Sequence, residues 1–122
     1  MSFESVLVGT DIEKIDRFPH LLQNESFMNG VFTDRERRYI DASHSREQTA
    51  AGIYCAKEAA AKAFGRGFFG IVPKELEILH DGSGAPYLTL SGDAEKHYGA
   101  FRFSLSISHD ADTAIAVVVA LK

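Results

Sequence analysis

Three ionisable side chains in this sequence have the types and spacing that metal-assisted phosphate chemistry requires. Glu58 and Lys62 are four residues apart in the alanine-rich stretch YCAKEAAAKAFGRG, so a helix would bring them onto one face. A carboxylate can hold a hard divalent cation, and an ammonium one turn away can meet a phosphate oxygen on that cation. Such a site needs a second carboxylate. Asp11 is a candidate because it follows Gly9 at the predicted end of a strand.

Each of these residues also has a purely structural interpretation. Glu58 and Lys62 could form an exposed ion pair on a helix, which contributes roughly 0.3 to 0.5 kcal/mol. Asp11 could cap a helix that begins at Ile12. His109, at the end of a predicted strand, could be a hydrogen-bonded histidine at the core edge, or it could reach a phosphate or a substrate hydroxyl.

The neighbours of Glu58 and Lys62 on a helical wheel favour a functional interpretation. The wheel puts both residues opposite the predicted core face, among side chains that are mostly small and uncharged. A solvated face usually carries several long polar side chains, so we expect a ligand or another backbone to lie across this one. The predicted core face holds Ile53, Ala56, Ala60 and Phe64, and the opposite face adds Ala51, Cys55, Ala61 and Gly65.

The pattern of apolar residues predicts the elements that position these side chains. Two capping boxes, Thr33-Asp-Arg-Glu36 and Ser45-Arg-Glu-Gln48, each start a helix, and Gly65 and Gly67 close the second one. Together the elements predict an α+β fold in which an antiparallel sheet packs against one long helix and several short ones. The predicted strands are 4–11, 75–80, 86–90, 101–109 and 113–121, and the predicted helices are 12–24, 34–42, 92–99 and the long one after Ser45.

The strand at 113–121, TAIAVVVAL, is apolar at both parities. A strand that is apolar on both faces must be covered on both. We therefore expect a helix on one side, and the pattern indicates another subunit on the other.

Composition limits the class of protein. A chain of 122 residues is the size of one domain, which we expect to span 1–122, and 45% hydrophobic with 25% charged residues is typical of a globular fold. The net charge of −4 argues against a general nucleic-acid binder. The sequence has no run of about 18 apolar residues and no signal-peptide pattern, so we expect no membrane span and a cytoplasmic location.

Four segments resemble, in order, those of the 4′-phosphopantetheinyl transferases, and within them the short holo-acyl-carrier-protein synthase type. They are VGTDIEKIDR (8–17), FTDRE (32–36), AKEAAAKAFG (56–65) and SISH (106–109). The first and third segments are specific at this separation, whereas the other two alone would be weak. Gly84-Ala-Pro86 occupies the place of a further family element.

The resemblance implies transfer of the phosphopantetheine arm of coenzyme A to a serine of an apo acyl carrier protein, with release of 3′,5′-ADP. By the family pattern, Asp11 and Glu58 would hold Mg²⁺ against the pyrophosphate, and Lys62 would add positive charge. Glu58 is also the candidate base for the serine hydroxyl, directly or through a metal-bound water. The residues implied to bind coenzyme A are Lys62, Gly65, Gly84, Pro86, Ser108 and His109.

Long members of the family contain two related halves in one chain, and this chain has the length of one half. The resemblance therefore also implies a homotrimer with active sites between neighbouring subunits. The carrier could belong to fatty acid, polyketide or another synthesis. It would be acidic, so the dock, which is the surface of this protein that binds it, should be basic. Arg17, Arg35 and Arg38 are the candidates for this dock, with Arg37 beside them. For the three arginines at 35–38, a solvated helix face is the alternative.

Two positions depart from the family pattern. Ile53 stands where many short members have arginine, and Ala85 stands where many have lysine. Both replaced residues are cations that could serve the nucleotide phosphates. Arg46 and Arg66 are candidate substitutes.

Two other functions compete with the transferase. A metal-dependent nuclease or phosphodiesterase would also use an Asp, a Glu and a Lys, but it predicts a basic groove that the net charge does not support. A non-catalytic module that binds coenzyme A or a carrier protein would not require both Asp11 and Glu58.

Overall fold

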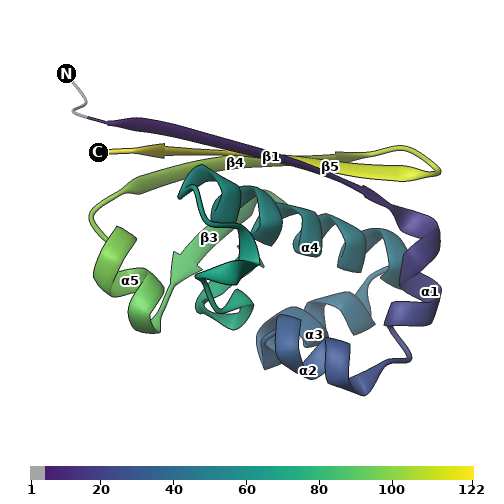
Figure 1. Cartoon of the computed structure of the whole chain (residues 1–122). Helices are drawn as coiled ribbons and strands as arrows, with labels where there is room; N and C mark the ends of the chain where they lie inside the picture. The colour runs from purple at the N-terminus through teal and green to yellow at the C-terminus, as the bar shows by residue number, and fades with distance from the viewer. Residues whose placement is uncertain (1–4) are drawn as a thin grey trace.

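The computed structural model describes residues 5–122 and shows a sheet covered by helices on one face only (Figure 1). The sheet is antiparallel with strand order β1-β5-β4, and β2 and β3 form a separate two-stranded hairpin. The helices are α1 (Phe18–Leu21), α2 (Glu25–Val31), α3 (Asp34–Ala42), α4 (Arg46–Ala63) and α5 (Gly92–Tyr98). The strands are β1 (Val6–Lys14), β2 (Leu76–His80), β3 (Pro86–Leu90), β4 (Arg102–His109) and β5 (Thr113–Leu121). Short 3₁₀ turns are η1 (Ile15–Arg17), η2 (Gly67–Phe69) and η3 (Pro73–Glu75).

The predicted α+β architecture is confirmed, and so are the elements with strong local signals. Thr33 and Glu36 form the predicted capping box of α3, and the Ser45 hydroxyl accepts the Gln48 amide at the start of α4. The Asp81 carboxylate accepts the Ser83 amide at 2.8 Å in the turn that joins β2 to β3. These caps depend on neighbouring residues only, which is why a sequence pattern can find them.

The region after Gly9 was predicted wrongly. β1 does not end at Asp11 but continues to Lys14, because Asp11 pairs with Ala116 and Lys14 with Thr113 in the ladder with β5. A helix over 12–24 is therefore absent, Asp11 does not cap one, and the chain instead forms η1 and α1. Residue 4 of the predicted strand lies outside the described residues. The helix α2, which begins after Asn24, was not predicted.

The long helix α4 lies across the inner face of the sheet (Figure 1). The small residues that the wheel placed opposite the core, Ala51, Cys55 and Ala61, are fully buried, so the backbone of the sheet covers this face. Gly9 permits the approach, since a Cβ at this position would collide with the backbone oxygen of Ala59. The expectation that a ligand or another backbone crosses the small face is thus met by β1 and β5.

A buried ion pair fixes the other side of α4. Lys57 and Glu36 are both fully buried, with 2.7 Å between Nζ and Oε1. Burial lowers the pKa of Lys57 and raises that of Glu36, while the charge of each partner opposes these shifts. Lys57 also donates to the carbonyls of Val31 and Pro73, and Glu36 accepts the amide of Ile78. This network holds α4 against α2, α3 and β2, and with them the adjacent Glu58.

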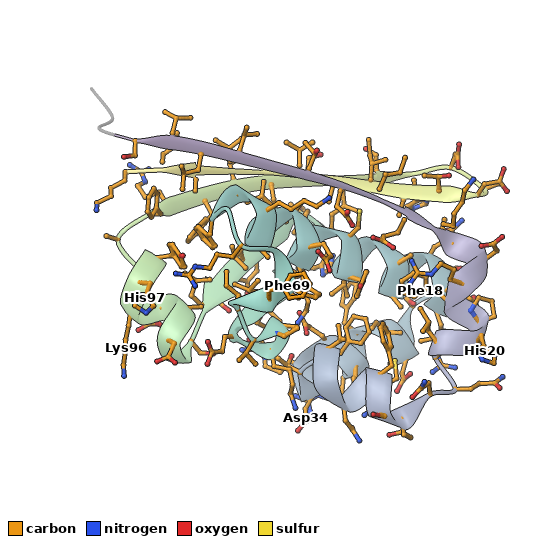
Figure 2. All side chains as sticks on the ribbon, in the orientation of Figure 1. Phe18, His20, Asp34, Phe69, Lys96 and His97 are labelled. Carbon is orange, nitrogen blue, oxygen red and sulfur yellow. The ribbon has the colours of Figure 1, made fainter. Side chains whose placement is uncertain are left out.

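No described element covers the outer face of the sheet, and side chains project freely from it (Figures 1 and 2). This face is apolar over β1 and β5. Its exposed large residues are Val6, Val8, Ile12, Ile115 and Val117. In the part of the chain that the structure describes, none of the helices is long and apolar enough to cross a membrane.

Candidate active site

Strand β1 places the first carboxylate of the site, Asp11, beside α4. Gly9, Asp11 and Glu13 alternate with exposed residues and face the helix. Because Gly9 lets the strand and helix backbones approach closely, the next inward residues lie beside the polar side chains of α4. Asp11 therefore meets Glu58 and Lys62 in the middle of a strand.

Lys62 and Asp11 form an ion pair, with 3.0 Å between Nζ and Oδ1. The Lys62 side chain is 51% exposed and that of Asp11 only 8%. The ion pair therefore links an exposed ammonium to a nearly buried carboxylate. The hydrogen bond to Asp11 raises the pKa of Lys62. An ion pair between Glu58 and Lys62 was the structural alternative for this lysine. In the described structure its ion-pair partner is instead Asp11 of β1.

Glu58 lies half-buried next to this pair. Burial, followed by the negative charge of Asp11, raises the pKa of Glu58. The Tyr54 hydroxyl lies 3.4 Å from Glu58 Oε1 and donates toward it. Burial and the charge of Glu58 raise the pKa of Tyr54 to about 12, which keeps this hydroxyl a donor at neutral pH.

A third carboxylate, Glu13, belongs to the same cluster and was not predicted. Burial raises its pKa to about 7, and the proximity and negative charge of Asp11 add to the shift. Arg17 opposes it through an ion pair of 2.7 Å to Glu13 Oε1. Inward and outward side chains alternate along β1, so a predicted strand that continued past Asp11 would have placed Glu13 on the same face as Asp11.

The carboxylates of Asp11 and Glu58 fit a divalent cation. Asp11 Oδ2 is buried and has no hydrogen-bond partner in the described structure, which leaves a hard oxygen ligand free. Among residues 5–122 no group of three or more His, Cys, Asp or Glu has the arrangement of a metal site. Two carboxylates are enough for Mg²⁺ when substrate phosphate and water supply the other oxygens.

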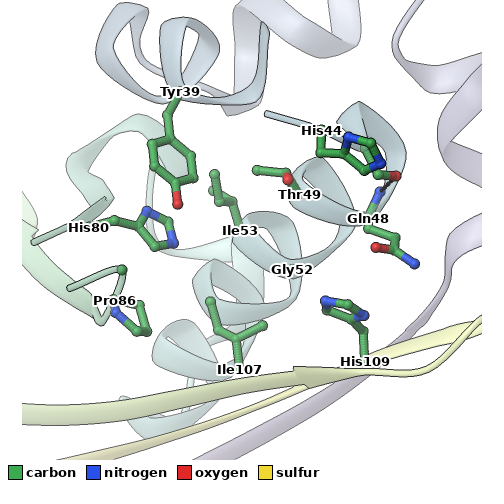
Figure 3. A pocket seen from close by; sticks show the side chains of 12 residues that line it. Tyr39, His44, Gln48, Thr49, Gly52, Ile53, His80, Pro86, Ile107 and His109 are labelled. Carbon is green, nitrogen blue, oxygen red and sulfur yellow. Dashed lines mark hydrogen bonds between the residues drawn. The ribbon is translucent and has the colours of Figure 1, made fainter. Parts of the chain in front are cut away.

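The residues predicted to bind coenzyme A are only partly brought together. Gly84, Pro86 and His109 line one cavity of about 320 Å³ between α4, β4 and the hairpin (Figure 3). Ser108 lies on the opposite face of β4 from His109 and does not line it. Gly65 ends α4 in a left-handed conformation, φ 76°, at the end of the helix that carries Lys62.

His109 is exposed, so the interpretation as a histidine at the core edge is wrong. Its position at the end of β4 directs it to the cavity with Ile107, two residues before it (Figure 3). Ile53, where family members often carry arginine, also lines this cavity.

The carboxylate cluster and the cavity lie on opposite sides of α4 in one chain. Asp11 on β1 and Ile107 on β4 both stand opposite Ala116, and β1 and β4 are the two edges of the sheet. Neither Asp11 nor Glu58 lines the cavity. A ligand that contacts both regions must therefore span about two strand spacings, roughly 10 Å, or join two copies of the chain.

The arginines predicted to form a dock lie in two places. Arg17 pairs with Glu13 beside the carboxylate cluster. Arg35 and Arg38, from α3, line a hollow next to the cavity, and Arg35 lies 3.8 Å from Glu77. Arg37 is engaged with Glu25 at 3.0 Å.

Comparison with known proteins decides the family. The family model of the 4′-phosphopantetheinyl transferase superfamily matches residues 7–118. The chain belongs to this superfamily. This confirms the resemblance carried by the segments around Asp11, Glu58 and His109.

Relatives within the superfamily match over most of their length. The holo-[acyl-carrier-protein] synthase of Clostridium acetobutylicum is 41% identical over 116 residues, which is 92% of this chain and 94% of that protein. The protein of the same name from Clostridium tetani is 38% identical over 113 residues, 89% of this chain and 90% of its own.

Solved structures of superfamily members have the same fold. The holo-(acyl-carrier-protein) synthase from Bacillus anthracis in complex with CoA (3′,5′-ADP) has a TM-score of 0.79 at 30% identity, covering 94% of this chain and 95% of that one. The Chronobacterium ammoniagenes ACPS-CoA complex has a TM-score of 0.83 at 31% identity, covering 97% and 98%.

Proposed function

We propose that this protein is a holo-acyl-carrier-protein synthase, which transfers the 4′-phosphopantetheine arm of coenzyme A to a serine of apo acyl carrier protein. The observation that carries this proposal is the match, over more than nine tenths of the chain, to synthases solved with coenzyme A. The cluster of Asp11, Glu58 and Lys62 supplies the groups that such a transfer needs.

The reaction exchanges one phosphoester bond for another. The serine oxygen bonds to the phosphorus that carries pantetheine, the bridging P–O bond of the pyrophosphate breaks, and 3′,5′-ADP leaves with the electron pair. Lys62 neutralises charge on the pyrophosphate. Glu58 takes the proton of the serine hydroxyl, and its raised pKa makes it a stronger base than an ordinary carboxylate.

Mg²⁺ is the cofactor that we propose for Asp11 and Glu58. When bound, it would polarise the phosphorus under attack and stabilise the leaving phosphate. The partnerless Asp11 Oδ2 and the half-buried Glu58 support this assignment.

We further propose that three copies assemble, with each active site shared between neighbours. Two observations support this proposal. The carboxylate cluster and the cavity are separated by α4 within one chain, and the outer face of the sheet is apolar and uncovered. An acidic carrier protein would dock on Arg17, Arg35 and Arg38, which all keep exposed side chains. The cytoplasm remains the expected location.

The competing functions have less support. A nuclease needs a basic groove, whereas no Lys or Arg is among the described residues that line the cavity. A module that only binds would have no use for both carboxylates, Asp11 paired with Lys62 and Glu58 beside them.

The test is the intact mass of apo acyl carrier protein after incubation with this protein, coenzyme A and Mg²⁺. We expect a gain of about 340 Da, the mass of the phosphopantetheine arm, which EDTA suppresses. No gain with carriers from several synthetic systems would contradict the proposed reaction.

A further inference from the structure

Glu13 is a carboxylate of the site that the proposed transfer does not use. It stands on the inward face of β1, two residues after Asp11 and opposite Ala114 of β5. Its side chain is only 10% exposed, and burial and the nearby Asp11 and Glu58 raise its pKa. A carboxylate that is buried among other carboxylates destabilises a fold, and such groups are frequent at functional sites. The position of Glu13 therefore indicates a role in the site.

The described partner of Glu13 is Arg17, four residues later in the chain. Nη1 of Arg17 donates to Oε1 of Glu13 at 2.7 Å, and the Arg17 side chain is 52% exposed. The buried end of the pair is thus the carboxylate, and the exposed end is the guanidinium. A guanidinium carries five N–H donors in a rigid plane, so a bond through Nη1 restricts its orientation and leaves other donors to a partner.

The backbone between the two residues is also fixed. Ile15 is buried, and its amide donates to the carbonyl of Asp112 at 2.9 Å, which ties the end of β1 to the turn before β5. Arg17 ends η1 and directly precedes α1, whose second residue is Pro19 (Figure 1). Proline restricts its own φ. The conformational freedom that Arg17 can lose on binding is therefore mainly that of its side chain.

The guanidinium of Arg17 lies beside the groups proposed to act on the serine. Its positive charge opposes the rise that burial causes in the pKa of Glu13. It likewise opposes the rise that burial and the charge of Glu58 cause in the pKa of Tyr54. Tyr54 in turn donates toward Glu58. A negative group bound by Arg17 would thus be held next to Glu58.

We propose that Glu13 is a positioning residue, which holds the guanidinium of Arg17 in the orientation that binds an acidic side chain of the carrier protein close to its serine. The inference rests on the proposed function, because it takes the carrier protein as the partner of Arg17. Glu13 itself contacts neither the serine nor coenzyme A in this role. Without Glu13, the carrier would have to order the long side chain of Arg17 on binding, and its affinity would fall.

Two other roles of Glu13 are alternatives that the test separates. The first is a third carboxylate ligand of the cation. Against it, Arg17 already binds Oε1 of Glu13, and the described part of the chain has no group of three His, Cys, Asp or Glu arranged to hold a metal. The second is a purely structural ion pair. Against it, the Arg17 side chain is half exposed, and exposed pairs contribute little to stability.

The experiment measures KM for the carrier protein, KM for coenzyme A and kcat in the variant Glu13→Met. Methionine has the length of glutamate and suits a buried position, but it cannot hold the guanidinium of Arg17. Because ordering a long side chain weakens binding, KM for the carrier should rise about three- to tenfold, while KM for coenzyme A and kcat at saturating carrier stay within about twofold. Glu13→Gln keeps an oxygen acceptor for Nη1 and should lose less. All constants are measured at about pH 8, above the pKa of Glu13, so that its carboxylate is ionised.

A double variant shows whether Glu13 acts through Arg17. In Arg17→Gln, KM for the carrier should rise at least as much as in Glu13→Met. Adding Glu13→Met to this variant should have no further effect, because no guanidinium remains to be positioned. The matched control is Glu25→Met, which breaks the exposed pair of 3.0 Å between Glu25 of α2 and Arg37 of α3. This control should leave all three constants unchanged.

Four outcomes would overturn the inference. One is an unchanged KM for the carrier in Glu13→Met, and another is a loss that adds to that of Arg17→Gln. A higher Mg²⁺ concentration for the half-maximal rate would make Glu13 a metal ligand. A lower midpoint of thermal unfolding, with equal losses in all constants, would make its role structural. Absence of transfer by the unmodified protein would instead contradict the proposed function, and fluorescence anisotropy of a labelled apo carrier protein would then compare the affinities of the same variants without turnover.

Discussion

At the scale of single residues, three carboxylates of the site share one small region of low exposure. Asp11 has a lysine partner, Glu13 has an arginine partner, and Glu58 has only a phenol. Burial and mutual repulsion raise the pKa of both glutamates. A cation brought to this cluster would relieve the repulsion, and a carboxylate with a raised pKa is suited to accept a proton near neutral pH.

The role of Glu58 is tested by Glu58→Gln. The amide keeps the size of the side chain but cannot accept the serine proton, so kcat should fall by about 10² or more while the fold and assembly persist. The mass assay measures this loss, and circular dichroism checks the fold. Glu95→Gln, an exposed change on α5, is the matched control. Near-normal turnover of Glu58→Gln would remove Glu58 from catalysis.

The role of Asp11 is tested by Asp11→Asn. The amide is a poorer ligand for Mg²⁺ and leaves Lys62 without its ion pair. Transfer should fail at low Mg²⁺ and recover in part with excess Mg²⁺, as a titration of initial rate against Mg²⁺ would show. A variant with normal rates at limiting Mg²⁺ would place the cation elsewhere.

Glu13 should make the stability of the metal-free protein depend on pH. Its pKa rises from 4.5 to about 7 on folding, so between these values the folded state holds more protons than the unfolded one. The free energy of unfolding should therefore fall as pH rises from about 5 to about 7, by about 1 kcal/mol after allowing for solvent screening. Urea unfolding in EDTA measures this fall, and Glu13→Gln should reduce it. An unchanged pH dependence in the variant would show that another group is responsible.

At the scale of elements, the site exists because α4 lies directly on β1. The alanine-rich face of the helix and Gly9 of the strand have little side-chain volume between them, so the two backbones approach closely. The buried Lys57–Glu36 pair holds the helix from the other side. Glu58 and Lys62 are thus positioned by packing as much as by helical spacing.

The variant Gly9→Ala tests this contact. The added methyl would collide with the backbone of Ala59, which cannot move aside as a flexible side chain could. We expect a loss of about 1 to 3 kcal/mol or more in the free energy of unfolding, together with a loss of transfer as α4 shifts. Gly30→Ala is the control, because a Cβ at Gly30 meets nothing within 4 Å and should stabilise α2 by about 0.5 to 1 kcal/mol. Equal stability of both variants would mean that the helix and strand can separate without cost.

At the scale of the whole molecule, the main feature is the apolar outer face of the sheet, which no described element covers. Val6, Val8 and Ile12 of β1 are each more than 60% exposed on a strand whose other face is buried against α4. Exposed apolar patches of this kind mark interaction surfaces in soluble proteins. The proposed trimer would cover this face and bring the cavity of one copy toward the carboxylates of the next.

The variant Val117→Lys tests the assembly. A lysine in the middle of the outer face would place an unpaired charge in the subunit interface, so the protein should sediment as a monomer and lose activity. Val72→Lys, at an exposed valine outside the sheet, should leave the sedimentation unchanged. If Val117→Lys sediments like the unmodified protein, the outer face is not the interface.

Features that depend on neighbours in the chain could be predicted from the sequence. The capping box at Thr33, the N-cap at Ser45, the turn at Asp81 and the spacing of Glu58 and Lys62 all act within a few residues, and the structure contains each of them. Of the capping box predicted at Ser45, the described structure contains the bond from the Gln48 amide to the Ser45 hydroxyl and not the return bond from the Gln48 side chain. The segments around Asp11 and Glu58 also carry the resemblance to the family to which the chain belongs.

Only the tertiary structure decided how those features combine. Pairing of β1 with β5, which lies near the other end of the sequence, extended the strand beyond Asp11, replaced a predicted helix and brought Glu13 into the cluster. A helical wheel treats α4 in isolation, so it could not show that the sheet buries Ala51 and Ala61. The cavity likewise gathers His44, His80 and His109 from three separate elements. The physical reason is the same in each case: local hydrogen bonds are encoded by neighbouring residues, whereas sheet pairing and packing depend on contacts between residues that the sequence keeps far apart.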